Sequence, residues 1–202
     1  TTDEGTTPLY VAAVKGYEEV VRLLIGGGAA INQVTTDYGF TSLHVAAQNG
    51  YIEVVRLLID NSAAVNQATT DNSRTPLFVA AQKGHTEVVG LLIGGCAAVN
   101  QVTTENGRTP LFVAAQKGHT EVVSLLIGGS AAINQATADN GRTPLYTAAE
   151  NGYIEVVRLL IVNGALLIDN SAAVNQATTD NSRTPLFVAA RSKPGDDGLW
   201  VH

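Results

Sequence analysis

Few side chains in this sequence are placed for catalysis. Cys96 is the only cysteine, and the equivalent residues 34 positions before and after it are serines. We therefore expect it to fill a small space rather than to act as a nucleophile, which would need a nearby base. His85 and His119 also lie 34 positions apart, and a shared metal ion would need ligands that the sequence does not offer. The sequence predicts no catalytic residue, no metal site and no cofactor, and an enzyme is the least expected class.

The composition disfavours several other classes. Charged residues make up 15% of the chain, against roughly 25% in average soluble domains. The net charge of −6 argues against general nucleic-acid binding and against a polybasic membrane anchor. No run of apolar residues is long enough to span a membrane. A single cysteine excludes an internal disulfide framework.

Thr-Pro-Leu or a close variant recurs at spacings of 34, 34, 34, 34 and 41 residues. The copies start at Thr7, Thr41, Thr75, Thr109, Thr143 and Thr184. They divide the chain into units at 3–36, 37–70, 71–104, 105–138, 139–179 and an incomplete 180–202. Because one unit cannot bury its apolar faces alone, we expect the units to stack into one elongated domain over 1–202.

The third unit indicates how each unit folds. Thr75 is expected to cap a first helix with Pro76 at its first position, and Gly84 is expected to end it in the left-handed conformation. A second helix is predicted to begin near His85 or Thr86. We place its left-handed cap in the column that holds only glycine and asparagine, rather than in the next column. That column is Gly27, Asn61, Gly95, Gly129 and Asn163. The segment that follows, with Thr-Thr before an Asp-Asn-Gly/Ser tip, predicts a β-hairpin.

These motifs resemble the ankyrin repeat family over residues 3 to about 190. The resemblance implies an all-α solenoid of about six 34-residue units, each with two helices and a β-hairpin. It also implies a protein-binding role without catalysis. Only His44 keeps the family's histidine, which aromatic residues replace in Tyr10, Phe78, Phe112, Tyr146 and Phe187. Together with low cysteine use and the absence of Asn-x-Ser/Thr acceptors, the resemblance favours an intracellular setting.

Three sets of equivalent residues are candidates for contact with a protein partner. The resemblance implies binding through the hairpin tips and the outer face of the first helix. The tip candidates are Asn72, Arg74, Asn106, Arg108, Asn140, Arg142, Asn181 and Arg183, with Tyr38 and Phe40 at the equivalent positions of unit two. The helix-face candidates are Gln82, Lys83, Gln116 and Lys117. The third set is the aromatic column, for which a stacked core is favoured over an exposed apolar ladder.

Each candidate set also has a simpler interpretation. For any single tip arginine, we slightly favour a surface ion pair with a nearby acid, worth about 0–1 kcal/mol, over contact with a partner. As a row, the arginines could still bind an anionic partner. The acids are Asp71, Glu105, Asp139 and Asp180. The helix face is equally consistent with a solvated surface.

The fifth unit carries seven additional residues, Val162 to Ile168. Seven residues are nearly two helical turns and would suit a longer second helix. However, Val162-Asn163-Gly164-Ala165 resembles a helix stop, so we favour a loop.

The terminal units lack polar caps, the tail 191–202 departs from the repeat, and Thr1 is not a translation start, so we expect a processed chain or a segment of a longer one.

The sequence thus predicts a protein–protein interaction module or scaffold. One alternative is a structural array or filament that self-assembles head to tail through its uncapped ends. Its support is the uniformity of the units, although residues 57–81 and 166–190 are identical over 25 positions, which also suits recent duplication. The other alternative is a spacer within a larger multidomain protein.

Overall fold

The structure is a computed structural model that describes residues 5–165. The sixth unit (180–202), its Asp180, Asn181, Arg183 and Phe187, residues 166–168 of the insertion and the tail 191–202 lie outside the described residues. Residues 5–165 form ten α-helices and no strand. The helices are α1 (Pro8–Lys15), α2 (Glu18–Gly26), α3 (Ser42–Asn49), α4 (Ile52–Asp60), α5 (Pro76–Lys83), α6 (Thr86–Gly94), α7 (Pro110–Lys117), α8 (Thr120–Gly128), α9 (Pro144–Glu150) and α10 (Ile154–Ala165).

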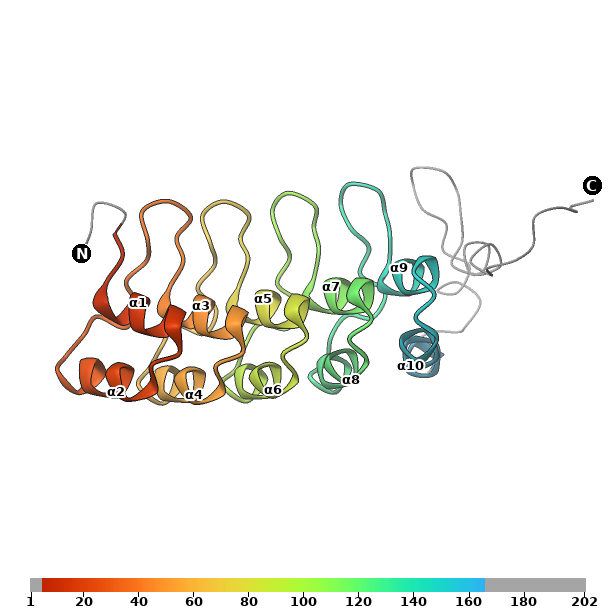
Figure 1. Cartoon of the computed structure of the whole chain (residues 1–202). Helices are drawn as coiled ribbons and strands as arrows, with labels where there is room; N and C mark the ends of the chain where they lie inside the picture. The colour runs from red at the N-terminus through yellow and green to blue at the C-terminus, as the bar shows by residue number, and fades with distance from the viewer. Residues whose placement is uncertain (1–4, 166–202) are drawn as a thin grey trace, which may run out of the picture.

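The helices form five antiparallel pairs that stack side by side in chain order (Figure 1). The odd-numbered first helices lie in one layer and the even-numbered second helices in the other. A long loop, which we call a finger, precedes each of the first helices α3, α5, α7 and α9 and projects away from the layer of second helices. Each helix contacts its own partner and the equivalent helices of the neighbouring units, as expected for a solenoid.

The first helices begin and end where the sequence predicts. The hydroxyl of Thr75 accepts a hydrogen bond from the Phe78 amide at 3.2 Å, and Pro76 takes the first helical position. Gly84 follows the helix with a φ of +80°, which an L-residue adopts only with strain. Thr109 and Gly118 repeat this arrangement around α7.

The left-handed residue after each of the second helices α4, α6 and α8 lies one position later than we predicted. Positive φ occurs at Ser62, Cys96 and Ser130, with values of 66°, 65° and 68°, whereas Gly95 has a φ of −83°. The Gly95 amide still donates to Leu91 within the helix, at 2.9 Å. Gly95 is small for a different reason, because a Cβ there would lie 3.3 Å from Ile59 of the preceding unit.

The predicted β-hairpins are wrong in detail, since residues 5–165 contain no strand. The fingers are instead closed by one or two main-chain hydrogen bonds, as from the Thr69 amide to the Arg74 carbonyl at 2.9 Å and from the Ser73 amide to the Thr69 carbonyl at 3.1 Å. Thr69 is buried, and its hydroxyl accepts a hydrogen bond from the Arg74 amide at 3.0 Å. Helix α5 begins at Pro76, two residues after Arg74, which leaves too little extended chain for a ladder of paired residues. Single main-chain bonds join neighbouring fingers, such as Thr70 N–H to the Tyr38 carbonyl at 2.9 Å.

The core runs along the stack between the two helix layers. In each complete interior unit the leucine after proline, both alanines and the Val-Val pair are buried. Phe78, Phe112 and Tyr146 are also buried, with exposed fractions of 4%, 2% and 1%. The stacked-core interpretation of the aromatic column is therefore confirmed for these three residues, while Tyr10 in the first unit is only half-buried.

Helix α10 includes Val162–Ala165, where we predicted a helix stop, and the predicted loop at 166–168 lies outside the described residues. Helix α10 continues to Ala165, three residues beyond the position at which α8 ends in its own unit. The side chain of Asn163 bonds back to the Leu159 carbonyl at 2.8 Å and does not cap a helix end. Val162 is 62% exposed, so the extension adds apolar surface. Within residues 5–165 no helix is long and apolar enough to cross a membrane.

Candidate functional site

The fingers and the ends of the first helices form one continuous surface. In the fifth unit, Nη1 of Arg142 at the finger base lies 2.8 Å from Oε2 of Glu150 at the end of α9. Gln116 and Gln82 take the place of Glu150 in the fourth and third units, where they follow Arg108 and Arg74. We call this the finger–helix surface. It holds the tip and helix-face candidates of the described residues, and in the fifth unit Arg142, one of the tip candidates, contacts the end of the first helix.

Aromatic rings hold the three arginines of this surface in place. The guanidinium carbon lies 5.9 Å from the ring centre of Phe40 for Arg74, 5.5 Å from Phe112 for Arg108, and 5.0 Å from Tyr146 for Arg142. An arginine over an aromatic face gains roughly 0.5–1 kcal/mol at an exposed site. Phe112 and Tyr146 of the buried aromatic column therefore lie beneath Arg108 and Arg142, whereas Arg74 lies over the half-buried Phe40 of the preceding finger.

The arginines differ in their ion pairs. Arg74 pairs with Asp71 at 2.6 Å, as expected, and Arg142 pairs with Glu150. The expected pair between Arg108 and Glu105 is absent from the described residues, because Oε2 of Glu105 instead accepts a hydrogen bond from the Asn72 side chain at 3.1 Å. Burial acts to raise the pKa of Asp71, but hydrogen bonds from Thr69 and Arg74 outweigh it and hold the pKa below its ordinary value.

The tip asparagines have structural roles in addition to any binding role. The side chain of Asn72 ties its finger to the next one through both the Glu105 side chain and the Glu105 amide. Asn140 accepts a hydrogen bond from the Thr137 hydroxyl at 2.8 Å within its own finger. Asn106 is half-buried, and its carbonyl accepts a hydrogen bond from the Ala138 amide of the next finger at 2.8 Å. The tips are therefore fixed in position before any partner arrives.

The second unit presents aromatic residues where the later units present asparagine and arginine. Tyr38 is 53% exposed, and its ring meets the half-buried ring of Phe40 edge-on at 6.5 Å. Phe40 in turn packs on His44 at 5.5 Å. Tyr38 thus offers a large exposed ring on a finger that packing holds in place, the kind of residue enriched at interface hot spots.

In α5 and α7 the residues at the end of the helix are the part that solvent reaches. From Pro76 to Ala81 every residue of α5 is buried, whereas Gln82 is half-buried and Lys83 is exposed. Helix α7 repeats this pattern, with Gln116 half-buried and Lys117 exposed. These four candidates are thus accessible to a partner.

His44 is a buried structural residue. Its Nδ1 accepts the Thr41 amide at 3.2 Å, and its Nε2 lies 3.0 Å from the carbonyl of Arg74 in the next finger. Burial lowers the pKa of His44 to about 4, against the hydrogen bonds that favour the charged form. The imidazole is therefore neutral at pH 7, with Nε2 donating and Nδ1 accepting.

His85 and His119 also have structural positions, as predicted. Each precedes a second helix, and Nε2 bonds the carbonyl of the preceding unit's glutamine, Gln48 for His85 at 2.9 Å and Gln82 for His119 at 3.2 Å. Cys96 occupies the left-handed turn after α6. Over residues 5–165 no three His, Cys, Asp or Glu side chains are grouped to hold a metal ion.

A family model of ankyrin repeats matches residues 1–69, 27–101, 77–166 and 132–197. The chain is an ankyrin repeat protein. Its family is generally one of protein–protein interaction modules, which agrees with the functional class that the sequence predicts. A search of curated proteins found no match to this ankyrin chain. That the units form a single domain over 1–202 stays a prediction.

Sequence reasoning missed the asparagine that joins successive ankyrin repeats on the side of the second helices. Oδ1 of Asn66 accepts the Ala98 amide at 2.7 Å, and its Nδ2 donates to the Cys96 carbonyl at 3.1 Å. Asn32 and Asn100 make the same two bonds to the units that follow them. The signal was the asparagine at this position in every Ala-x-Asn-Gln segment.

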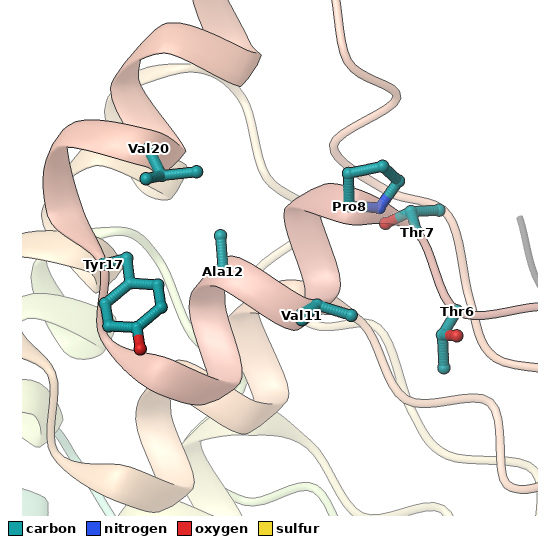
Figure 2. Close-up of a pocket in the computed structure, with 7 residues that line it drawn as sticks. All are labelled: Thr6, Thr7, Pro8, Val11, Ala12, Tyr17 and Val20. Carbon is teal, nitrogen blue, oxygen red and sulfur yellow. The ribbon is translucent and has the colours of Figure 1, made fainter.

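The first ankyrin repeat exposes an apolar pocket (Figure 2). Its lining comes from α1, α2 and the segments before them, namely Thr6, Thr7, Pro8, Val11, Ala12, Tyr17 and Val20. Val11 is 51% and Val20 44% exposed, whereas the equivalent residues of the next unit, Val45 and Val54, are 7% and 2% exposed. The expected apolar surface at this end is therefore present, although sequence reasoning did not name its residues.

Proposed function

We propose that this chain binds a protein partner along the finger–helix surface. The observation that carries the proposal is the contact between Arg142 and Glu150, which makes the fingers and the first-helix ends one surface. That surface offers guanidinium groups, amide side chains, ammonium groups and one exposed phenol ring. Arginine and tyrosine are enriched in protein interfaces, and a partner that contacts several units can bury a standard interface area.

Rigidity of this surface also supports the proposal. Main-chain hydrogen bonds and the side chain of Asn72 join neighbouring fingers, and aromatic rings fix the arginines. A surface that is ordered before binding loses less conformational entropy when a partner docks. The scaffold role follows from the same geometry, since a long stack can hold different partners on different units.

Affinity capture with matched variants tests this function. The surface variant combines Tyr38→Asn, Lys83→Ala and Lys117→Ala. It removes one exposed aromatic ring and two charges, and asparagine already occupies the position of Tyr38 in other fingers. Wild-type chain and variant are immobilised, and the proteins retained from a native lysate are quantified by mass spectrometry.

The control variant makes equivalent losses on the second helices. Leu125→Asn, Arg56→Ala and Arg158→Ala remove one exposed apolar side chain and two charges from that layer, where all three residues are exposed. We expect proteins captured by the wild-type chain to be lost with the surface variant and kept with the control. Equal loss with both variants, or no enrichment over an empty matrix, contradicts the proposal.

The pocket of the first unit favours a second function, head-to-tail self-association. Every interior unit buries the residues equivalent to Val11 and Val20 beneath the preceding unit, so this face fits a helix pair of the same kind, which we propose a second copy supplies. Light scattering over a range of micromolar concentrations tests this candidate. We expect a mass that rises with concentration and that Val11→Gln with Val20→Gln abolishes. A wild-type chain that is monomeric throughout contradicts it.

A further inference from the structure

Arg108 differs from the two arginines on either side of it. Arg74 and Arg142 each have a carboxylate within 3 Å. Among residues 5–165, no ion pair and no hydrogen bond involves the guanidinium of Arg108. Within the same range its Nε–H is buried without an acceptor, as are those of Arg74 and Arg142, so the missing carboxylate is what sets Arg108 apart. Two substitutions between units explain the difference. Gln116 stands where the fifth unit has Glu150, and Glu105 bonds the neighbouring finger.

Two lysines add to the charge of this region. Lys83 and Lys117 are exposed at the ends of α5 and α7, and these helices contact each other. The bond between His119 Nε2 and the Gln82 carbonyl holds the two helix ends together, so the lysines project about one helix-packing distance apart, ~8–10 Å. Helices α5 and α7 carry no acidic residue. We call Lys83, Arg108 and Lys117 the basic cluster.

The acidic groups that border the basic cluster bond to other residues or lie in the layer of second helices. At the fingers, Asp71 pairs with Arg74, and Glu105 bonds Asn72. Glu87 and Glu121 lie in the first turns of α6 and α8, in the layer of second helices. Neither glutamate is within ion-pair distance of Lys83 or Lys117 in the described part of the chain. The cluster therefore presents three cations without a carboxylate among them.

Arg108 is held ready for an anion. Its guanidinium lies over the Phe112 ring at 5.5 Å, and its side chain is half-buried. The fifth unit shows which group such an arginine binds. Arg142 lies over Tyr146 at 5.0 Å and donates to a glutamate oxygen at 2.8 Å. An arginine fixed in this way loses little side-chain entropy when it binds a carboxylate, and its fork geometry matches both oxygens.

We propose that the basic cluster binds an acidic segment of a protein partner, with one carboxylate at Arg108 in the position that Glu150 takes at Arg142. The inference rests on the proposed protein-binding function and names the chemistry of the partner. Lys83 and Lys117 receive further carboxylates of the same segment. The bordering Asp71, Glu105 and Asp139 disfavour a continuous phosphate backbone, whereas the spaced carboxylates of a peptide can avoid them.

Fluorescence anisotropy with a labelled polyglutamate peptide tests the proposal. A peptide of about ten residues spans roughly 33 Å when extended and so covers the cluster. Gln116→Glu rebuilds at Arg108 the carboxylate that Glu150 supplies to Arg142, in a nearly isosteric change. Ser124→Glu is the matched control, because it adds the same charge on the exposed face of α8. Lys83→Gln with Lys117→Gln tests the flanking charges while leaving Arg108 unchanged.

We expect Gln116→Glu to weaken peptide binding about tenfold or more, since it fills the site and repels the ligand. Ser124→Glu should change the affinity by less than about twofold, because exposed charges far from the site are screened by salt. The double lysine variant should also bind several-fold more weakly. Equal binding by Gln116→Glu and Ser124→Glu, or no binding to the wild-type chain, overturns the proposal. Tighter binding of a uridylate oligonucleotide of equal extended length than of the peptide overturns it in favour of a nucleic acid.

The outcome is separable from that of the capture experiment. If the peptide result is negative while the surface variant still loses proteins that the control keeps, the acidic-partner inference fails and the protein-binding function stands. If capture shows no dependence on the finger–helix surface, the proposed function itself fails.

Discussion

The imidazole of His119 lies directly over Gly84 of the preceding unit. A Cβ built on Gly84 would lie 2.7 Å from both Cε1 and Nδ1 of that ring. His85 covers Gly50, and Tyr153 covers Gly118, in the same way. The glycine therefore does two things at once, since it allows the positive φ that ends a first helix and makes room for the ring that joins the next unit. This contact between the ring and the glycine keeps the helix ends aligned and so positions the basic cluster.

Gly84→Ala should destabilise the chain. The left-handed backbone costs an alanine about 1–2 kcal/mol, and displacement of the His119 ring adds to that. We expect a loss of about 2–3 kcal/mol in the free energy of unfolding, measured by urea denaturation. Gly90→Ala is the control, because Gly90 lies within α6 and a Cβ there meets nothing within 4 Å. That change should stabilise the chain by about 0.5–1 kcal/mol. Changes of the same sign in the free energy of unfolding of both variants would contradict the proposed role of Gly84.

Cys96 should be replaceable by glycine with a gain in stability. Its φ is +65°, and Gly28 already takes the same column in the first unit with a φ of +82°. Relief of the left-handed strain, less the added freedom of glycine in the unfolded chain, should give about 0.5–1 kcal/mol. Thermal unfolding under reducing conditions measures it. The reverse change, Gly28→Ala, should lower stability by a similar amount, and a gain there would show that the strain argument is wrong.

Much of the fold followed from the spacing of a few residue types. Thr75, Pro76 and Gly84 each have a local requirement, so the bounds of the first helices were predictable. The end of the second helices was not, because Gly95 is small for contact with Ile59 rather than for its own φ. A packing requirement between units cannot be distinguished from a dihedral requirement in one sequence.

The candidate surface was predictable as a set of residues but not as a pattern of charge. The sequence places an acid near every tip arginine, yet the ion pair forms within the finger for Arg74 and across to α9 for Arg142. Arg108 has neither, because the Asn72 side chain reaches Glu105 in the next finger. Which acid an arginine meets depends on contacts between units, which the order of residues within one unit does not contain.

His44 should make stability depend on pH between about 4 and 6.5. Its pKa is about 4 in the folded chain, against an ordinary value of 6.5, so the unfolded chain binds a proton first as the pH falls. The contribution of His44 to stability is thus present above pH 6.5 and decreases toward pH 4. From pH 7.5 to pH 5 we expect a loss of about 2 kcal/mol.

Urea denaturation of the wild-type chain and of His44→Phe at both pH values measures this loss. Phenylalanine occupies the equivalent position in three other units and does not titrate, so the loss should be smaller by about 2 kcal/mol in the variant. The low pKa values of Asp37 and Asp71 act only below about pH 4 and leave this window unaffected. The same pH dependence in both chains would mean that His44 is not the titrating group.

The central claim, that a protein partner contacts the fingers and the first-helix ends, is tested most directly by hydrogen–deuterium exchange. The wild-type chain is measured alone and in complex with a protein purified by its capture. The account predicts slower exchange on binding at finger amides such as Asn72, Arg74, Asn106 and Arg108, with no change in the exposed second helices α6 and α8. Protection confined to α6 and α8, with the fingers unchanged, would contradict it.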